Sequence, residues 1–118
     1  MTEEHNIQNE IRLEMSKHGI ILFRTNAGVM WQGKKVYSHE FKQDVLINLR
    51  PVVGLPEGHA DLSGLRKSDG RAVFIEVKTP TGRVSEAQQN FIQQMQKCHA
   101  IAGVARSIDD ALKVVGIT

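Results

Sequence analysis

Apolar side chains recur at four-residue intervals near the start of the chain, on one face of a helix expected over residues 6–18. A glycine directly after this range is typical of a helix C-terminus. At about 100° per residue, Glu4 projects onto the middle of the same apolar face. Glu4 therefore either precedes the first turn, where the helix dipole favours a carboxylate, or is an acidic group of a functional site. The residues of the pattern are Ile7, Ile11, Met15 and Gly19.

Short apolar runs and capping signals continue through the second half of the chain. Residues 20–23 are expected to form a short buried strand, residues of about 100–105 are expected to form a final strand, and Ser107 begins a last helix. Ser85 and Gln88 match a capping box at the start of another helix. With the hairpin described next, the expected order is approximately αβββαβα. This order corresponds to a mixed β-sheet flanked by helices, in one α/β domain over residues 1–118.

Two strand-like runs, residues 60–66 and 71–78, are separated by four residues typical of a tight turn, and together they predict a β-hairpin. Two registers are open. If Ser68 and Asp69 form a two-residue loop, Asp61 pairs opposite Glu76. If Asp69 and Gly70 form the loop, Asp61 pairs opposite Lys78. In both registers the three side chains share one sheet face, because residues two apart on a strand point the same way. The turn residues are Lys67, Ser68, Asp69 and Gly70.

Residues 26–59 lack a clear hydrophobic period. Within them, residues 41–49 read as either a short helix or a strand. Trp31 and Tyr37 either line a nucleic-acid groove with nearby basic side chains or are core or rim residues, and the second interpretation is favoured. The basic side chains of this segment are Lys34, Lys35, Lys42 and Arg50.

Composition is ordinary for a globular domain, with 41% hydrophobic and 24% charged residues, so a disordered chain is not expected. The first ten residues are polar and acidic, and no apolar run is long enough to cross a bilayer. These features predict a cytoplasmic protein without a membrane partner. The single cysteine, Cys98, is expected to be a small buried hydrophobe rather than a reactive thiol.

Net charge is only +2, but acidic residues crowd the first helix and leave the rest of the chain basic. Between residues 66 and 83, five cationic side chains are expected to flank the end of the hairpin that carries Asp61. Such a surplus suits a polyanionic partner, and a solvated surface explains it equally well. The cationic residues are Arg66, Lys67, Arg71, Lys78 and Arg83.

The group formed by Asp61, Glu76 and Lys78 suits metal-dependent phosphodiester cleavage, in which a carboxylate-bound divalent ion activates water and stabilises charge on the phosphate. Asp61 and Glu76 are the expected ligands. The carbonyl of Val77 completes a set that suits Mg²⁺ or Mn²⁺. Lys78 either favours hydroxide through its charge or acts as the base. A structural Glu76–Lys78 pair gives the same residues, but ionic groups ending an apolar strand are costly unless they serve a function. His59 is expected to be a supporting or exposed histidine.

The ordered combination of these residues resembles a stand-alone VRR-NUC domain, a branch of the PD-(D/E)XK nuclease superfamily. Ala60 stands where the name of the superfamily has a proline, and this departure removes no chemical group from the site. The segments that carry the resemblance are 4–8, 58–62 (Gly-His-Ala-Asp-Leu), 74–78 (Phe-Ile-Glu-Val-Lys), 82–88 (Gly-Arg-Val-Ser-Glu-Ala-Gln) with Phe91, and 107–111.

The resemblance implies a restriction-endonuclease-like core, dependence on Mg²⁺ or Mn²⁺ without an organic cofactor, and cleavage of DNA chosen by structure. Carried over by position, Asp61 and Glu76 resemble the metal ligands and Lys78 the catalytic lysine. Gln88 resembles the helix glutamine beside the site, and Glu4 the acidic residue of the first helix. Short members resemble phage or bacterial proteins that act as homodimers in the bacterial cytoplasm. Side chains expected to contact DNA are Arg24, Lys34, Lys35, Arg66, Arg83 and Ser85.

Together these observations predict a metal-dependent endonuclease that cleaves four-way (Holliday) junctions as a homodimer, with phosphate contacts and little reading of base sequence. One active site cuts one strand, and a two-fold dimer presents a matched pair of sites to a junction. The alternatives are a flap or other branched-DNA nuclease, and a catalytically silent nucleic-acid-binding module of the same fold.

Overall fold

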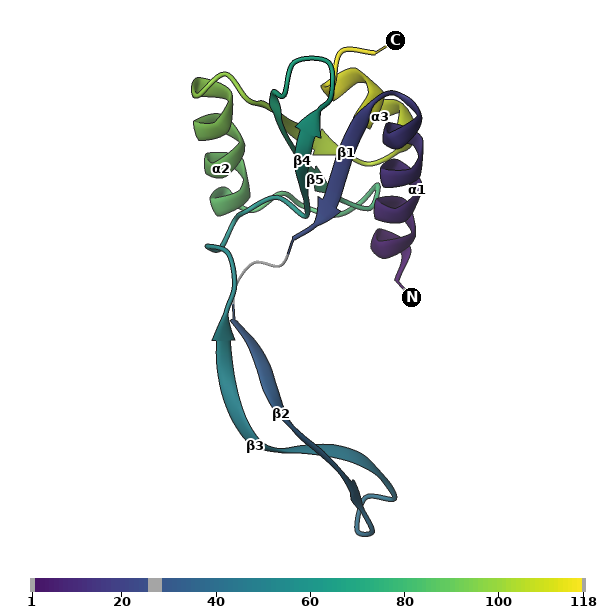
Figure 1. The fold of residues 1–118 in the computed structure, drawn as a ribbon, viewed down its shortest axis with the longest axis vertical. Helices are drawn as coiled ribbons and strands as arrows, with labels where there is room; N and C mark the ends of the chain where they lie inside the picture. The colour runs from purple at the N-terminus through teal and green to yellow at the C-terminus, as the bar shows by residue number, and fades with distance from the viewer. Residues whose placement is uncertain (1, 26–28, 118) are drawn as a thin grey trace.

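The computed structural model describes residues 2–25 and 29–117, and in these residues it places three helices, a four-stranded sheet and a separate two-stranded hairpin (Figure 1). The sheet has the order β1-β4-β5-β6. β4 is antiparallel to both of its neighbours, β1 and β5, whereas β5 and β6 are parallel. This mixed α/β core confirms the expected order αβββαβα. Its elements are α1 (Glu3–Lys17), β1 (Ile20–Arg24), β4 (Leu62–Arg66), β5 (Ala72–Val77), α2 (Glu86–Lys97), β6 (Ile101–Ala105) and α3 (Ile108–Val114).

Helices cover both faces of the sheet, and the alternation of side chains along β5 decides which residues meet which helix. Val73, Ile75 and Val77 point into the main core, where they join apolar residues of α1 and α3. Phe74 and Glu76 point the other way, toward α2. The core therefore lies on one face, and the ionisable end of β5 lies on the other. Core residues from the other elements are Ile11, Met15, Ile20, Leu22, Leu62, Ile101, Ala105, Ala111 and Val115.

Each helix begins at a residue whose hydroxyl caps its first turn. Thr2 accepts a hydrogen bond from the amide of His5, so α1 starts before the expected residue 6 and includes Glu4. Ser85 caps α2 with both halves of the expected capping box, and Ser107 caps α3. Among the described residues, no helix has the length and apolar character required to span a bilayer.

The β4–β5 hairpin adopts the first of the two registers left open by the sequence. Leu62 pairs with Ile75, and Leu65 pairs with Ala72. Continued by one position, this register sets Asp61 opposite Glu76. The loop of the hairpin is closed by a hydrogen bond of 2.9 Å from the amide of Arg66 to the carbonyl of Arg71.

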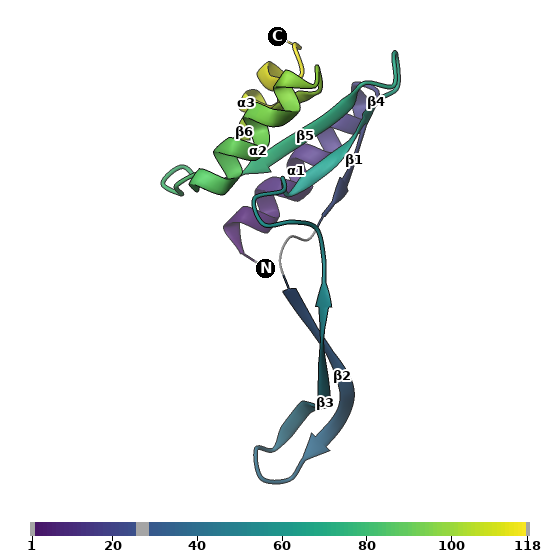
Figure 2. The same ribbon diagram turned by 90° about the vertical axis from the view of Figure 1, so that its left-hand side faces the viewer.

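A long hairpin, which we call the arm (residues 29–53), projects from one end of the core (Figure 1). β2 (Val29–Ser38) pairs antiparallel with β3 (Gln43–Val53), so the segment 41–49 contributes to a strand and not to a helix. Figure 2 shows the same projection from the side of α2. The radius of gyration is 17.0 Å because the arm extends the longest dimension to 55 Å. A compact chain of this length has a radius of about 13.5 Å.

A β-bulge interrupts the arm near its middle. The register shifts between Gln32 and Lys34, so that Gly33 lies opposite two residues of β3. One of them, Asn48, has a φ of 53°, a left-handed conformation that asparagine adopts more readily than most residues. A Cβ atom on Gly33 would lie 2.7 Å from the backbone oxygen of Ile47, so only glycine fits here.

Two expectations about burial are wrong. Trp31 and Tyr37 are neither core nor rim residues, since they lie on the arm with 61% and 56% of their surface exposed. Cys98 is exposed rather than buried, because α2 ends there and turns its last residues to solvent.

Candidate active site

Asp61, Glu76 and Lys78 lie at one end of the β4–β5 hairpin, opposite its turn. Asp61 directly precedes β4, Glu76 is the second-last residue of β5, and Lys78 follows that strand. The alternation of the strand turns Glu76 and Lys78 to the same face, and the register brings Asp61 beside them. Tertiary pairing thus gathers the three groups that the sequence singled out.

Glu76 is the most constrained of the three, with 1% of its surface exposed. Its Oε1 accepts a hydrogen bond of 2.9 Å from Nε2 of Gln88 and lies 3.7 Å from Nζ of Lys78. Its Oε2 is buried and has no hydrogen-bond donor among the described residues. A buried carboxylate oxygen without a partner is unfavourable, so this atom is prepared for a ligand that neutralises it.

Asp61 is held from two sides. Its Oδ2 accepts a hydrogen bond of 3.0 Å from the amide of Val77, and its backbone oxygen accepts one of 2.8 Å from the amide of Thr25. In an antiparallel pair, the N–H and C=O of one residue point to the same neighbouring strand. The carbonyl of Val77 therefore points toward the side on which Asp61 lies, as expected for a third oxygen ligand.

Burial raises the pKa of Glu76 to about 8, and the neighbouring charge of Asp61 adds to this effect, while Lys78 opposes it. Two adjacent carboxylates either share a proton or bind a cation, because mutual repulsion disfavours the doubly ionised pair. The unpartnered Oε2 of Glu76 and the oxygens of Asp61 and Val77 fit a divalent ion. Among the described residues, no cluster of three or more His, Cys, Asp or Glu side chains is present. A ligand set of only two carboxylates and one backbone carbonyl leaves coordination positions for water, as Mg²⁺ prefers.

Gln88 connects the start of α2 to the site. Its Oε1 accepts from the amide of Ser85 at 2.9 Å, which completes the capping box, while its Nε2 donates to Glu76. These two partners determine the orientation of the amide group. The side chain therefore fixes Oε1 of Glu76 and leaves Oε2 available.

Replacing Gln88 by alanine is expected to lower DNA cleavage by about 10- to 100-fold, because residues that orient metal ligands typically have effects of that size. The matched control is Ser107→Ala, which removes the hydroxyl that caps α3. This control is expected to lower the free energy of unfolding by about 1 kcal/mol and to leave cleavage unchanged. Single-turnover rates and denaturant unfolding of both variants are the measurements. Equal rates for Gln88→Ala and the parent protein contradict an orienting role.

The segment that leads into Asp61 is closely packed against α2. Gly58 has a φ of 90°, and a Cβ atom there would lie 2.6 Å from the backbone oxygen of Ala87, so no side chain fits. The ring of His59 packs against Phe91 of α2 and Phe74 of β5, with centroid distances of 4.6 and 5.8 Å. His59 is therefore a supporting residue, one of the two roles expected for it.

Glu4 lies in the first turn of α1, partly exposed, and Gln8 on the same helix is buried. No hydrogen bond or ion pair joins Glu4 to Asp61, Glu76 or Lys78 in the part of the chain that the structure describes. Its assignment as a further acidic group of the site stays a prediction.

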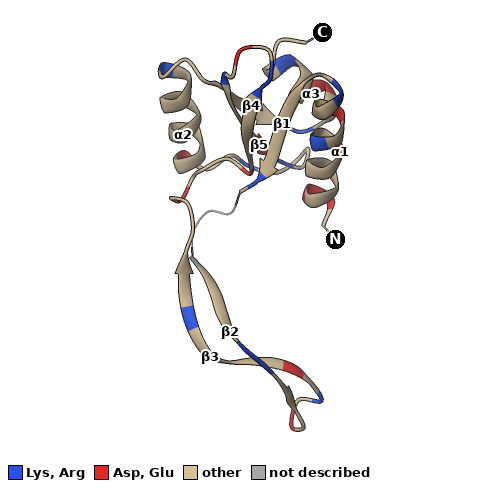
Figure 3. Ribbon diagram, in the orientation of Figure 1, with Lys and Arg blue, Asp and Glu red and all other residues tan. Residues whose placement is uncertain are grey.

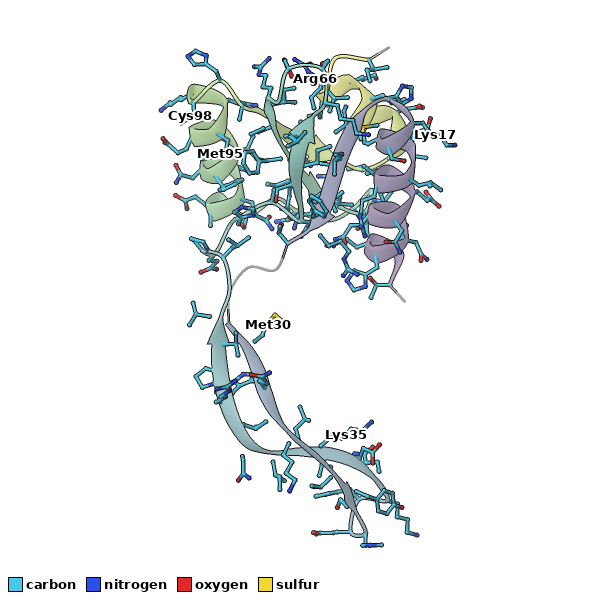
Figure 4. The ribbon with its side chains drawn as sticks, in the orientation of Figure 1. Lys17, Met30, Lys35, Arg66, Met95 and Cys98 are labelled. Carbon is cyan, nitrogen blue, oxygen red and sulfur yellow. The ribbon has the colours of Figure 1, made fainter. Side chains whose placement is uncertain are left out.

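The basic residues expected to flank the site are divided between the two ends of the hairpin. Arg66 lies at the turn end, where its Nη2 is 2.6 Å from Oδ2 of Asp69 (Figure 4). Arg71 also lies there and donates to the backbone oxygen of His99. The expectation that this whole run flanks the carboxylates is therefore wrong, because a hairpin sends its turn residues to the far end of its strands.

The other side chains expected to contact DNA are spread over the core and the arm. Figure 3 shows Lys and Arg on both parts. Arg24 ends β1 next to Thr25, which contacts Asp61, so it lies near the site. Arg83 is exposed in the loop before α2, and Ser85 caps that helix. The remaining two, Lys34 and Lys35, lie on the arm, with Lys35 paired to Asp44 at 3.3 Å.

Two residues that support the site, Thr25 and Arg106, were not identified as site residues from the sequence. The hydroxyl of Thr25 donates a hydrogen bond of 2.6 Å to the backbone oxygen of Ala60, and the backbone amide of Thr25 donates another to the backbone oxygen of Asp61. Arg106 donates from Nη1 to the carbonyls of Thr79 and Gly82 at 2.6 and 2.7 Å, which holds the turn after Lys78. Both act on backbone oxygens of distant segments, and such acceptors leave no signal in a sequence.

Comparison with known proteins identifies the family. The family model of the VRR-NUC domain matches residues 2–109. A search of curated proteins found no match. The matched range contains Asp61, Glu76, Lys78 and Gln88 and nearly the whole core, which confirms the expected family. The chain belongs to the VRR-NUC domain family, and it is therefore a nuclease-family protein of the PD-(D/E)XK type.

Proposed function

We propose that this protein is an endodeoxyribonuclease that uses Mg²⁺ or Mn²⁺ and cleaves four-way DNA junctions as a homodimer. The family implies a nuclease that acts on DNA and, in general, uses a divalent metal. The observation that carries the proposal is the buried Oε2 of Glu76, which has no donor among the described residues and lies in a site shared with Asp61 and Lys78.

Asp61, Glu76 and the carbonyl of Val77 are the groups that would hold the ion. When bound, a divalent ion activates a water molecule and stabilises charge on the scissile phosphate. Gln88 and the amide of Val77 keep the two carboxylates in place through bonds of 2.9 and 3.0 Å. Preorganised ligands need no rearrangement when DNA arrives, which is a general source of catalytic rate.

Lys78 supplies positive charge next to these carboxylates. Its side chain is 15% exposed, so it is largely desolvated but still in contact with solvent. We propose that it stabilises negative charge on the attacking oxygen and the phosphate, where a partly desolvated cation acts more strongly than in water. The turn held by Arg106 begins at the next residue and limits the movement of Lys78.

The substrate proposal follows from the number of sites. The described residues of one chain form one such cluster, which can cut one strand, whereas symmetrical incision of a four-way junction needs two sites related by a two-fold axis. Basic side chains on both the core and the arm suit phosphate contacts without base reading (Figure 3). Restriction of a specific sequence is disfavoured because the described core and arm include no separate recognition domain.

Cleavage in the presence of Mg²⁺ should be compared on four-way junction, flap, single-stranded and linear duplex DNA of the same sequence. We expect the junction to be cut at least about tenfold faster than the linear duplex, because the two sites of the proposed dimer are expected to fit the two symmetry-related strands at a branch point. Preferred cutting of the flap supports the branched-DNA alternative. Equal rates on junction and linear duplex contradict structural selection.

A further inference from the structure

The excess positive charge of the chain lies on the arm, and the active site does not account for it. The arm carries four Lys and Arg residues against two Asp and Glu residues, whereas the rest of the chain carries eleven of each class. The formal net charge of +2 is therefore located on this element alone. A positively charged ribbon that projects from the core suits contact with a polyanion. The charged residues of the arm are Lys34, Lys35, Lys42, Arg50, Glu40 and Asp44.

Part of this charge gathers at the β-bulge. An open hollow of about 340 Å³ lies there, and the described residues that line it include two cationic side chains and no acidic one. Oε1 of Gln32 accepts hydrogen bonds from Nε of Arg50 at 3.1 Å and from Nη2 at 2.6 Å, which orients the guanidinium group. Within the described part of the chain, Lys34 forms no ion pair. A hollow with this composition suits a phosphate group. Its lining residues are Gln32, Gly33, Lys34, Asn48 and Arg50.

An exposed aromatic side chain lies next to the hollow. Trp31 pairs opposite Pro51, one position from the pair formed by Gln32 and Arg50, and 61% of its surface is exposed. Aromatic rings stack on nucleic-acid bases, and proline and other apolar side chains insert between base steps. The arm therefore places base-contacting groups and phosphate-contacting groups within a few residues of each other.

Both faces of the ribbon carry apolar and cationic side chains. Adjacent positions of a strand point to opposite faces, so Met30 and Arg50 lie on one face, and Trp31 and Lys35 lie on the other. Figure 4 shows no other described element beside the arm, so both faces are open. A ribbon that lies in the groove of a duplex contacts the base edges with one face. Strands that diverge at a branch point pass along both faces, so a branch point fits this distribution better than a continuous duplex does.

The arm is joined to the core beside the active site. Thr25, which precedes the arm, donates from its amide to the backbone oxygen of Asp61. The ten residues of β2 extend over about 33 Å, close to the length of one turn of duplex DNA, about 34 Å. The arm can therefore contact a branch point while Asp61, Glu76 and Lys78 face a phosphate within about one turn of it.

We infer that the arm recognises the branch point of the DNA: Trp31 stacks on a base exposed there, and the hollow around Lys34 and Arg50 binds the phosphate of a neighbouring nucleotide. The inference rests on the proposed function, because it names the feature of branched DNA that the protein binds, but it concerns binding and not cleavage. Stacking accepts any base, so this contact selects DNA structure and not sequence. In a continuous duplex every internal base is already stacked on both sides, so no base is free for Trp31.

Trp31 is the single tryptophan of the chain, so the indole fluorescence of the protein reports on this contact directly. The parent protein is titrated, in the presence of a chelator that prevents cleavage, with a four-way junction and with a linear duplex of the same sequence. The junction is expected to quench the emission of Trp31, because stacking on a base quenches indole, and the duplex is expected to leave it unchanged. Fluorescence anisotropy of dye-labelled DNA gives the Kd of both complexes.

Variants separate the two parts of the contact. Trp31→Thr keeps a β-forming residue and should weaken junction binding by about tenfold without a change in duplex binding, whereas Trp31→Phe retains a ring and should stay within about threefold of the parent protein. Lys34→Gln/Arg50→Gln should weaken junction binding and reduce its salt dependence by about two phosphate contacts. The matched control Lys17→Gln/Lys113→Gln removes two charges from the last turns of α1 and α3 and should change neither quantity. Circular dichroism verifies that all variants fold.

Unchanged emission of Trp31 on a junction that binds, or equal quenching by junction and duplex, overturns the inference. Emission that changes on dilution of the protein alone, and not with DNA, assigns the arm to contact between protein chains and also overturns it. The proposed function fails separately: a protein whose Trp31 is quenched by the junction but that cuts no DNA with Mg²⁺ contradicts the nuclease proposal and leaves the role of the arm standing. A protein that cuts junctions without any response of Trp31 contradicts the inference alone, and one that binds neither DNA contradicts both.

Discussion

Replacing Lys78 by alanine is expected to reduce DNA cleavage by at least about a hundredfold while junction binding stays within about threefold of the parent protein. The ammonium group of Lys78 lies 3.7 Å from Glu76 in a largely buried site, so its charge acts there with little screening. A charged or proton-transferring group in that position typically contributes 10²–10⁴-fold to a rate. Binding is expected to change little, because Lys78 is only one of the cationic side chains that are spread over the core and the arm (Figure 3).

Single-turnover cleavage and equilibrium binding to the same junction measure the two effects of Lys78→Ala. Lys17→Ala is the matched control, because it removes one lysine charge from the end of α1, where Lys17 is exposed and pairs with Glu14 at 3.4 Å. This control should change neither quantity. Equal losses of cleavage and binding in Lys78→Ala would assign the Glu76–Lys78 pair a structural role, as in the catalytically silent alternative.

Replacing Glu76 by glutamine is expected to abolish metal-dependent cleavage, with a loss of about 10³-fold or more, because the carboxylate proposed to bind the ion is replaced by a neutral amide. The substitution keeps the shape of the side chain. The new amide oxygen can accept from Gln88, and the new amide nitrogen can donate to Asp61. Loss of activity therefore reports the loss of charge and not a rearrangement of the fold.

The same variant is expected to be more stable than the metal-free parent protein at high pH. Burial and Asp61 raise the pKa of Glu76 to about 8 in the folded chain, from 4.5 as the ordinary value. The folded state therefore retains a proton that the unfolded state releases. The stability that this group contributes is fully present below pH 4.5 and is lost as pH rises through about 8. Glutamine does not titrate, so the advantage of Glu76→Gln grows over that interval to the order of a few kcal/mol.

Denaturant unfolding with a chelator at pH 5 and pH 9 measures this difference, and Glu10→Gln on the exposed face of α1 is the control. Added Mg²⁺ or Mn²⁺ should restore the stability of the parent protein at pH 9 and leave Glu76→Gln unchanged, because an ion that binds only the folded state stabilises it. A parent protein whose stability does not respond to metal would contradict the assignment of Glu76 as a ligand.

The parts of the fold that the sequence predicted are those in which at least one face of an element is buried. Ile7, Ile11 and Met15 repeat with the period of a helix because that face packs on the sheet. Val73, Phe74 and Ile75 form an apolar run because β5 lies inside the sheet with helices over both of its faces. The arm gave no such signal. Both of its faces are exposed, so its apolar residues follow no period, and residues 41–49 were compatible with either a helix or a strand.

The residues of the candidate site also fall into a group that the sequence identified and a group that it did not. Asp61, Glu76, Lys78 and Gln88 could be named from short motifs, because strand alternation and helix capping are local rules. Thr25 and Arg106 could not, since their partners are carbonyls of segments 35 and 24–27 residues away. Arg66 was misplaced for a related reason: nearness to Asp61 in sequence says nothing about which end of a hairpin a residue occupies.

By itself, the sequence determined the αβββαβα core, the family and the chemical groups of the site, because periodicity, caps and motif spacing act over a few residues. Only the tertiary structure decided the register that sets Asp61 beside Glu76, the burial that raises the pKa of Glu76 and the projection of the arm. These three properties depend on which distant segments pair and which surfaces they exclude from water, and that information belongs to the folded chain as a whole.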